Sequence, residues 1–208
     1  MKLPAELANK KEWTLVGPMG PRLSEIHRSF PIVGVNGGAH FCDEMDLWIG
    51  DGDSFAGPIR SKHILTFPSK KAQSDLALAF ALFNEAPSVT LHCWGFLGGR
   101  RDHELLNFGE ALRFLKRKSD SQITFYDAHG RGQIRCLGPG SWGLNHHGLF
   151  SLASLETVNV KLQGACEYPL ENLTPLPALS SLGLSNSASG KVELTTDGAL
   201  MIIFPEKL

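Results

Sequence analysis

Several common signatures are missing from this sequence, and each absence narrows the range of functions. Charge of one sign is not in excess, because 20 lysine and arginine residues face 21 acidic residues, with a formal net charge of -1. Proteins that bind nucleic acids or anionic membranes usually carry a basic excess, so neither partner is expected. No apolar run reaches the ~18 consecutive residues that a membrane-spanning helix requires.

Cysteine is scarce, and the four present form neither a C-x-x-C pair nor a recognisable metal-binding spacing: Cys42, Cys93, Cys136 and Cys166. This usage is typical of reduced core cysteines in a cytosolic protein rather than of disulfides. The N-terminal residues, MKLPAE, carry charge and proline where a signal peptide needs an apolar run. We therefore expect a soluble, cytoplasmic protein.

Two nucleotide-binding signatures are also absent or incomplete. The sequence contains no G-x-x-x-x-G-K-[ST], which excludes a P-loop enzyme. The segment 36–39, N-G-G-A, lacks the full glycine fingerprint of dinucleotide-binding domains, so hydride transfer has little support.

The composition that remains is that of a globular protein with two kinds of local pattern. Hydrophobic residues make up 42% and charged residues 20% of the 208 residues, enough for one large domain or two small ones. Residues 30 to about 118 alternate short apolar runs with helical patterns, as βαβ units do. After about 120, short strands alternate with glycine and proline turns, which predicts a small all-β domain, a sandwich or a flattened barrel.

The periodicity places the expected elements. In the first part, strands are expected at 32–35, 47–49, 63–67 and 89–94, and helices at 74–85 and 102–118. Ser74 suits the N-cap of the first helix, and Asp75 suits its first turn. In the second part, strands are expected at 122–126, 132–137, 149–152, 158–162, 191–195 and 200–204, with turns at 127–130 and 196–198.

Polar and glycine-rich segments follow the predicted strands of the first part, at 36–38, 50–54, 68–75 and 98–103. Ligands bind at the carboxyl ends of the strands in an open parallel sheet, so these segments are expected to converge on one cleft. The strongest signal is G-D-G-D-S at 50–54, where two carboxylates one residue apart can reach one cation. Mg²⁺ takes hard oxygen ligands and substrate phosphates, although a solvated acidic turn is the alternative.

The segment 98–103, G-G-R-R-D-H, is the second signal. Glycine amides at a helix start form an anion site, and an arginine can grip a phosphate there. Asp102 is a helix cap, a metal ligand or a general base, and His103 is an acid/base residue or a hydrogen-bonded neighbour. Asp75 is as easily structural as functional, and the Lys70–Lys71 pair before it is expected to be solvated surface. Together, the carboxylates and the glycine–arginine segment favour phosphoryl or diphosphoryl transfer.

At this point the motifs resemble the thiamin pyrophosphokinase family, which moves a diphosphate from ATP to the hydroxyl of thiamine. That family carries D-G-G-A, G-D-x-D-S, D-Q-x-D, G-G-R-x-D-H and a late S-N pair. This chain has N-G-G-A at 36–39, G-D-G-D-S at 50–54, A-Q-S-D at 72–75, G-G-R-R-D-H at 98–103 and S-N at 185–186. The order and spacing match from about residue 30 to the C-terminus.

The resemblance implies a Rossmann-like α/β catalytic domain over 1–120 and a β-sandwich thiamine-binding domain over 121–208. It implies a homodimer that binds thiamine between the catalytic domain of one subunit and the β-domain of the other, with Mg²⁺ as cofactor. The catalytic residues that it implies are Asp51, Asp53, Asp75 and Asp102, the first three as metal ligands. The implied ATP contacts are Asn36, Gly37, Gly38, Gln73, Gly98, Gly99, Arg100 and His103. The implied thiamine contacts are Tyr168, by a cation–π contact, with Ser185 and Asn186.

Three departures from the family pattern leave the acceptor open. Asn36 and Ala72 stand where the family has aspartates, and the lysine common shortly after the second aspartate is missing after Asp75. Fewer carboxylates weaken cation binding and can alter the substrate. Two alternatives are therefore a diphosphokinase for another alcohol, such as a hydroxymethyl pterin, and a non-catalytic binding protein that kept the fold.

Overall fold

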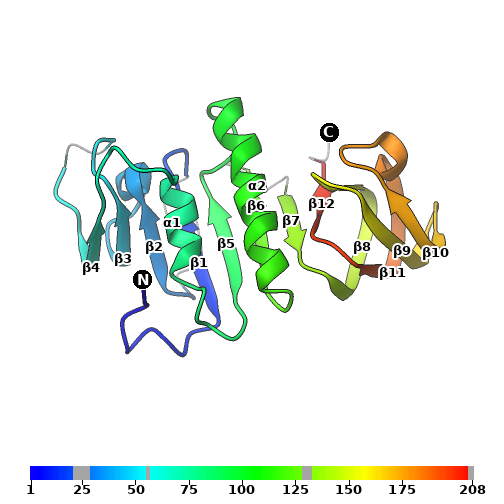
Figure 1. Cartoon of the computed structure of the whole chain (residues 1–208), viewed down its shortest axis with the longest axis horizontal. Coiled ribbons are helices and arrows are strands. Elements are labelled where there is room, and N and C mark those ends of the chain that lie inside the picture. Colours follow the sequence, from blue (N-terminus) through cyan, green and yellow to red (C-terminus); the bar gives the residue numbers. More distant parts are fainter. Residues whose placement is uncertain (21–28, 55–56, 128–132, 206–208) are drawn as a thin grey trace. The chain divides into compact units, whose positions relative to one another are not determined.

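The computed structural model describes residues 1–20, 29–54, 57–127 and 133–205. The chain separates into two compact units (Figure 1). The first comprises Met1–Ala111 and Ile123–Arg131, and the second comprises Leu112–Gln122 and Gly132–Leu208. The β structure is mixed, and no helix among the described residues is long and apolar enough to cross a membrane.

Parallel pairing organises the first unit. Its strands lie in the order β6-β5-β1-β2-β3-β4, in which β1 pairs parallel with β2 and β5, and β3 pairs parallel with β2 and β4. The strands are β1 (Glu12–Val16), β2 (Ile32–Val35), β3 (Met45–Gly50), β4 (Ser61–Thr66), β5 (Thr90–Trp94) and β6 (Gln122–Tyr126). The expected strands at 32–35, 47–49, 63–67, 89–94 and 122–126 are confirmed to within two residues at each end.

Strand β1 was not predicted, although it lies at the centre of this sheet. Its side chains Trp13 and Leu15 are fully buried, and it pairs on both sides. The segment alternates polar and apolar residues from Glu12 to Leu15, but the strand is only five residues long, so its signal is weak. Its place in the core comes from the strands that flank it, which are distant along the chain.

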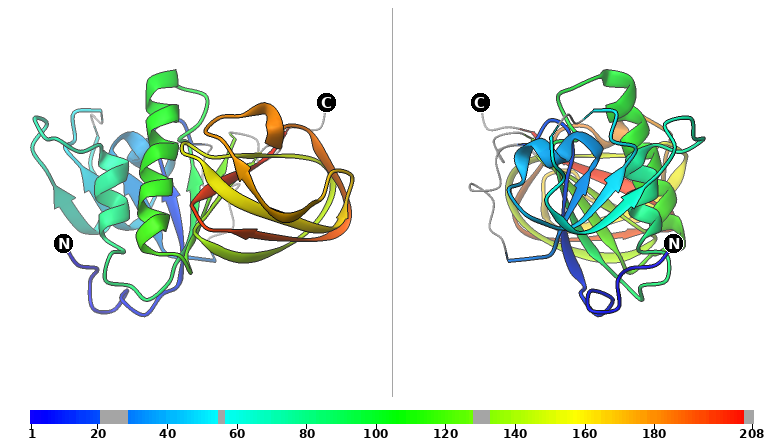
Figure 2. Two further views of the ribbon diagram at one scale, coloured as in Figure 1. Left: turned by 45° about the vertical axis from the view of Figure 1, so that its right-hand side comes forward. Right: turned by 90° about the vertical axis from the view of Figure 1, so that its left-hand side faces the viewer.

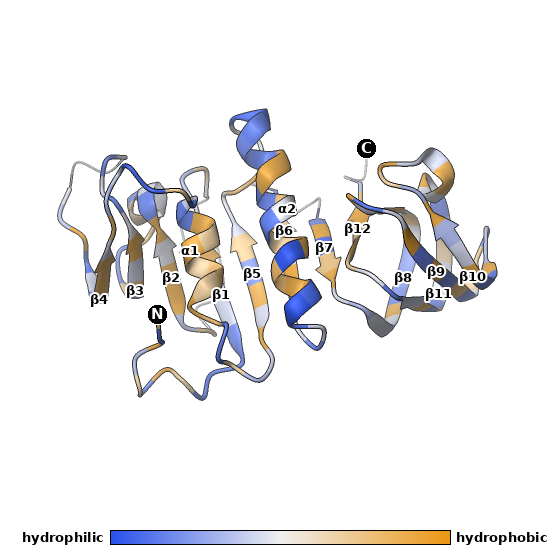
Figure 3. Ribbon diagram, viewed as in Figure 1, coloured by the Kyte–Doolittle hydropathy of each residue, from blue (hydrophilic) through white to orange (hydrophobic). Residues whose placement is uncertain are grey.

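Helices α1 (Asp75–Ala81) and α2 (Arg101–Arg117) lie on the same face of the strands of the first unit (Figure 2). Ser74 is the N-cap of α1, as expected, because its hydroxyl accepts a hydrogen bond from the Ala77 amide at 3.1 Å. The helix is shorter than the expected 74–85, since the chain continues in turns after it. Figure 3 shows hydrophobic and hydrophilic sides on α2, which ends in Lys116 and Arg117, as the helix dipole favours.

Antiparallel pairing organises the second unit, in the order β10-β9-β11-β8-β12-β7. The strands are β7 (Gln133–Leu137), β8 (Gly140–Ala153), β9 (Val158–Cys166), β10 (Leu170–Leu176), β11 (Asn186–Thr196) and β12 (Leu200–Phe204). Their buried apolar residues, among them Phe150, Val160 and Leu194, form one core cluster.

The sequence located most of these strands but not their lengths. The expected strands 149–152 and 191–195 are the ends of the long strands β8 and β11, and β10 was not expected. Polar residues and glycines interrupt the apolar alternation in the missed parts. The turn at 196–198 is confirmed by a 2.9 Å hydrogen bond from the Thr196 hydroxyl to the Gly198 carbonyl. The turn expected at 127–130 lies mostly outside the described residues.

The loops that follow β1 and β5 pack backbone against backbone. The Gly17 amide donates to the Trp94 carbonyl at 2.7 Å, and the Met19 amide donates to the Gly95 carbonyl at 3.1 Å. Gly95 has a φ of 78°, and a Cβ there would lie 2.5 Å from the Cα of Gly20. Position 95 therefore requires glycine for both conformation and space.

We expect Gly95→Ala to lower the free energy of unfolding by at least about 1–3 kcal/mol, because the added methyl group overlaps main-chain atoms that cannot move independently. Urea unfolding followed by circular dichroism measures this change. Gly143→Ala is the control, since a Cβ at that exposed position meets nothing within 4 Å. Equal stability of the two variants would contradict the close approach at Gly95.

Candidate functional site

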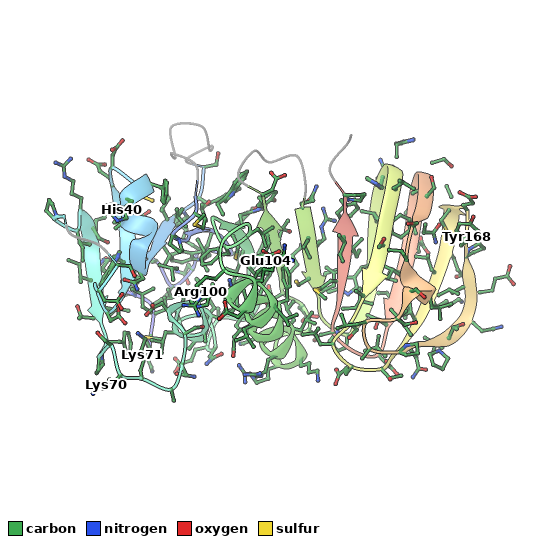
Figure 4. The ribbon with its side chains drawn as sticks, turned by 90° about the horizontal axis from the view of Figure 1, so that it is seen from above. His40, Lys70, Lys71, Arg100, Glu104 and Tyr168 are labelled. Carbon is green, nitrogen blue, oxygen red and sulfur yellow. The ribbon has the colours of Figure 1, made fainter. Side chains whose placement is uncertain are left out.

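The loops at the carboxyl ends of β1, β2 and β3 touch one another. Asn36–Phe41 forms a 3-10 helix, η2, directly after β2. A Cβ at Gly38 would overlap the Val16 carbonyl, and one at Gly37 would lie 3.1 Å from Pro18. The His40 Nε2 atom lies 3.1 Å from the Ser54 carbonyl oxygen. Figure 4 labels His40. Segments 36–38 and 50–54 therefore meet at one end of the sheet.

The loop at 17–20, which follows the unexpected strand β1, is the link to the next segment. A Cβ at Gly99 would lie 3.3 Å from the Met19 side chain, and Gly95 packs on this loop as described above. The 17–20 loop therefore contacts both the 36–38 segment and the 98–99 segment. Its sequence, G-P-M-G, is itself a turn signal that would have pointed to it.

Asn36 is the centre of a polar cluster at this end. Its Nδ2 atom donates toward Asp51 Oδ1 at 3.1 Å, Asp53 Oδ1 at 3.1 Å and Asp75 Oδ2 at 3.0 Å. Its φ of 45° is left-handed, a region that asparagine tolerates better than most residues. The Trp48 indole donates to the Asn36 carbonyl at 3.0 Å and helps to fix this conformation. Three of the predicted carboxylates therefore share one amide nitrogen.

Lys71 completes the cluster, contrary to the expectation that both lysines of the 70–71 pair lie on solvated surface. Its Nζ atom lies 2.7 Å from Asp51 Oδ2 and 3.0 Å from Asp75 Oδ1, and its side chain is only 14% exposed. Lys70 is exposed, as expected. The signal that could have identified Lys71 is its spacing four residues before Asp75. Figure 4 labels both lysines in the loop before α1.

The ion pairs set the charges of the cluster. The hydrogen bond from Lys71 lowers the pKa of Asp51 to about 2, against the opposing effect of burial, and the Asp53 amide contributes further. Burial alone would lower the pKa of Lys71, but its interactions with the carboxylates of Asp51 and Asp75 outweigh this and raise it. Asp51 and Lys71 are therefore both charged at neutral pH.

The donor set of the cluster suits a hard cation such as Mg²⁺, which takes oxygen ligands. Carboxylate oxygens of Asp51, Asp53 and Asp75 lie together, and Asn36 Oδ1 is a buried acceptor that no hydrogen bond satisfies. Across the described residues, however, no three or more His, Cys, Asp or Glu side chains are arranged as a metal site. The Asn36 amide and the Lys71 ammonium occupy the space between the carboxylates instead.

Asp102 lies in a separate, exposed group. Its Oδ2 accepts from Arg100 Nη2 at 2.6 Å, and its Oδ1 accepts from Arg100 Nε at 3.1 Å and from the His103 amide at 3.0 Å. The hydrogen bonds from Arg100 lower the pKa of Asp102 to about 2. The contacts of Asp102 are thus local to the start of α2. Gln73 and His103 are both exposed.

The amide of Gly98 also has a carboxylate partner within the chain. It donates to Glu104 Oε2 at 3.2 Å, and Gly98 has a left-handed φ of 82°. Gly98 and Glu104 also line an open groove of about 560 Å³. Its other lining residues are Gly99, Arg101, Leu105 and Phe108. Sequence reasoning found the glycines but missed Glu104, which is one helical turn into α2.

In the second unit, Asn186 holds the backbone of Tyr168. Its Nδ2 donates to the Tyr168 carbonyl at 2.7 Å, and its Oδ1 accepts from the Tyr168 amide at 3.1 Å and from the Ser187 amide at 2.8 Å. The Tyr168 side chain is 59% exposed. Ser185 is exposed, and its amide donates to the Ser151 hydroxyl at 3.0 Å. Asn186 therefore positions the tyrosine through main-chain bonds.

No protein-family model matches the sequence, and no curated protein matches it. Solved structures do. A thiamine pyrophosphokinase from Bacillus subtilis matches with a TM-score of 0.72 and 22% identity, covering 96% of this chain and 100% of that chain. The chain has the fold of thiamin pyrophosphokinase structures.

Two further structures support this assignment of the fold. A thiamin pyrophosphokinase family protein from Enterococcus faecalis has a TM-score of 0.74 and 20% identity, and covers 95% of this chain and 100% of its own. The thiamin pyrophosphokinase from Candida albicans has a TM-score of 0.76 and 12% identity, and covers 100% of this chain and 92% of its own. The thiamin pyrophosphokinase fold thus extends over both units of the chain.

The lowered pKa of Asp51 predicts an acid-dependent stability. Its ionised form stabilises the folded protein above the ordinary pKa of 3.8, and this contribution is lost as the pH falls toward about 2. We expect Asp51→Asn to lower the free energy of unfolding by about 2 kcal/mol at pH 6, and the difference from wild type to vanish near pH 2. Urea unfolding in EDTA across this range measures it, with the exposed Asp120→Asn as control. A difference that does not depend on pH would be inconsistent with the ion pair.

Proposed function

We propose that this protein is a thiamine diphosphokinase, which transfers diphosphate from ATP to the hydroxyl of thiamine and releases AMP. The observation that carries the proposal is the gathering of Asp51, Asp53 and Asp75 around Asn36, at the carboxyl ends of parallel strands. The shared fold supports it, because the similar structures from Bacillus subtilis and Candida albicans are named for this activity.

Asp51, Asp53 and Asp75 are proposed to hold Mg²⁺, with Asn36 Oδ1 as a further oxygen donor. When bound, the cation offsets charge on the phosphates. The rest of the chemistry is positioning and electrostatic stabilisation. The alcohol oxygen attacks the β-phosphorus in line, the bond from this phosphorus to the oxygen shared with the α-phosphate breaks, AMP leaves, and the hydroxyl proton passes to water.

The segment 98–103 is proposed to bind the polyphosphate of ATP. The amides of Gly98 and Gly99 precede α2, where anions are favoured, and Arg100 can bond two phosphate oxygens at once. In the structure, Arg100 and the Gly98 amide are bonded to the carboxylates of Asp102 and Glu104. A phosphate therefore has to replace these carboxylates, which keep the donors oriented until it arrives.

The second unit is proposed to supply the acceptor site as a β-sandwich domain in a cytoplasmic homodimer. Tyr168 is its candidate for stacking on the cationic thiazolium ring, because an aromatic face attracts a cation. Several apolar side chains of this unit are more than half exposed, namely Leu149, Leu173, Leu179, Leu182 and Leu184. Exposed apolar surface of this kind favours association with another protein surface, here a second copy.

Two features of the cluster favour a different acceptor or a non-catalytic protein. Asn36 brings an amide nitrogen between the carboxylates, and Ala72, which is exposed, brings no carboxylate at all. The assay is incubation with ATP and Mg²⁺ and with thiamine, a hydroxymethyl pterin or no acceptor, followed by quantification of AMP. AMP with the pterin alone would identify the other acceptor, and thiamine binding without AMP would identify a binding protein.

We expect Asp53→Asn to lower thiamine-dependent AMP release by a factor on the order of 10² to 10³, the scale of losing one electrostatic stabiliser. Asp53 is exposed, so the substitution leaves no buried gap and the circular dichroism spectrum should not change. Asp120→Asn removes an exposed carboxylate elsewhere and should retain full activity. Undiminished turnover of Asp53→Asn would remove this residue from the catalytic set.

If each active site contains residues of both subunits, two different inactive variants should regain activity when they form a mixed dimer. Asp53→Asn affects the catalytic unit and Tyr168→Ala affects the acceptor unit, so a hybrid dimer contains one intact site. Random mixing of the two variants should restore about one quarter of wild-type activity, because half of the dimers are hybrids with half of their sites intact. Mixed activity that merely averages the two parents would show that each subunit acts alone.

A further inference from the structure

Lys71 and Asn36 both contact the carboxylates of Asp51 and Asp75. The two oxygens of Asp51 are divided between Asn36 and Lys71, with Oδ1 at 3.1 Å from the Asn36 amide and Oδ2 at 2.7 Å from the Lys71 ammonium. Asp75 is held in a similar way, with Oδ2 at 3.0 Å from the Asn36 amide nitrogen and Oδ1 in an ion pair with the Lys71 ammonium at 3.0 Å, although Oδ1 accepts no hydrogen bond. Lys71 and Asn36 thus bridge the same two carboxylates from both sides.

The environment of Lys71 distinguishes this bridge from a surface ion pair. The exposed fractions of the side chains are 14% for Lys71, 6% for Asp51 and 19% for Asp75, so water screens the pair little. A lysine ammonium is a compact point charge with three donors, and it can replace a cation between carboxylates. Removal of one partner from such a pair leaves an uncompensated charge, which is strongly unfavourable.

We infer that Lys71 occupies the cation position of this cluster, so that a divalent cation binds Asp51 and Asp75 only by displacing the lysine ammonium. The inference rests on the proposed function in one respect, namely that these carboxylates bind a cation. Lys71 is therefore a positioning residue that holds the ligands of the cation together in its absence and competes with it for them.

The side-chain amide of Asn36 can interact with the cluster both when Lys71 is in place and when a cation has displaced it. Its Nδ2 now faces the carboxylates, while its Oδ1 is buried without a hydrogen-bond partner. A half-turn of the amide exchanges the two atoms and presents an oxygen in place of a donor. The same side chain can thus offset carboxylate charge when Lys71 is in place and ligate a cation when Lys71 has left.

Displacement also gives the released ammonium a new partner. A nucleotide polyphosphate brought in with the cation offers negative oxygens beside the site. We therefore expect the cation alone to bind wild-type protein weakly and to bind more tightly together with a non-hydrolysable ATP analogue. Lys71→Met should keep only the part of this difference that comes from phosphate oxygens binding the cation directly, because it has no ammonium to release.

The decisive experiment measures Mn²⁺ binding to the full chain without nucleotide, from the electron paramagnetic resonance signal of the free ion. Lys71→Met should bind Mn²⁺ at least about tenfold tighter than wild type, since the competing charge is gone. Lys70→Met removes a charge from the neighbouring, exposed position and should change the affinity little. Equal or weaker binding by Lys71→Met would overturn the inference.

Thermal unfolding provides a second readout. In EDTA, Lys71→Met should melt below wild type, and Mn²⁺ should raise its melting temperature by more than it raises that of wild type. If Lys71→Met does not fold without metal, Lys71→Gln keeps a polar group and allows the same titration. A Lys71→Gln protein whose melting temperature is insensitive to Mn²⁺ would also contradict the displacement.

Neither measurement uses ATP turnover or thiamine, so the inference and the proposed function can fail independently. A protein that releases no AMP but binds Mn²⁺ more tightly after Lys71→Met would retain the displacement and lose the catalytic assignment. A wild-type enzyme that releases AMP normally, with unchanged Mn²⁺ affinity in Lys71→Met, would retain the activity and lose the displacement.

Discussion

Mutual repulsion of carboxylates is the constraint on which this end of the molecule depends. Asp51 and Asp53 follow β3 and Asp75 begins α1, so the fold itself brings like charges together. Such an arrangement is tolerated only when positive groups or donors lie between the oxygens. Lys71 and Asn36 provide them within the chain, which explains why a lysine of a polar loop is almost completely enclosed.

Local pattern predicted those elements whose stability is decided locally. The N-cap at Ser74, the helix α2 and the apolar strands β2, β3 and β5 all carry periodicity or capping signals within their own residues. Strand β1 is short, and glycines and polar residues interrupt the first half of β8, so the conformation of both depends on partners far along the chain. Tertiary context decides such segments, and a single sequence does not display it.

The candidate site, too, could be predicted from the sequence only in part. The topology of a parallel sheet brings together residues at strand ends, and the contact between segments 36–38 and 50–54 could be inferred from it. Which side chains form ion pairs depends on their exact positions in the folded structure. Lys71 forms a largely buried ion pair with Asp51, whereas Arg100 forms an exposed ion pair with Asp102. The pairing of Lys71 with Asp51 does not follow from spacing, because 20 positions separate the two residues in the sequence. The pairing of Arg100 with Asp102 does not follow from residue type, because Glu104 is another acidic residue nearby.

The attachment of Tyr168 to Asn186 has a consequence for substitutions at position 168. The amide of Asn186 contacts only main-chain atoms of residue 168, and the aromatic ring takes no part in the attachment. The position of the backbone is thus independent of the side chain that it carries. Replacement of the tyrosine by another residue would change the exposed side chain without removing the hydrogen bonds that hold the backbone at this position. For the proposed acceptor site, position 168 is therefore a point at which specificity can change, by evolution or by design.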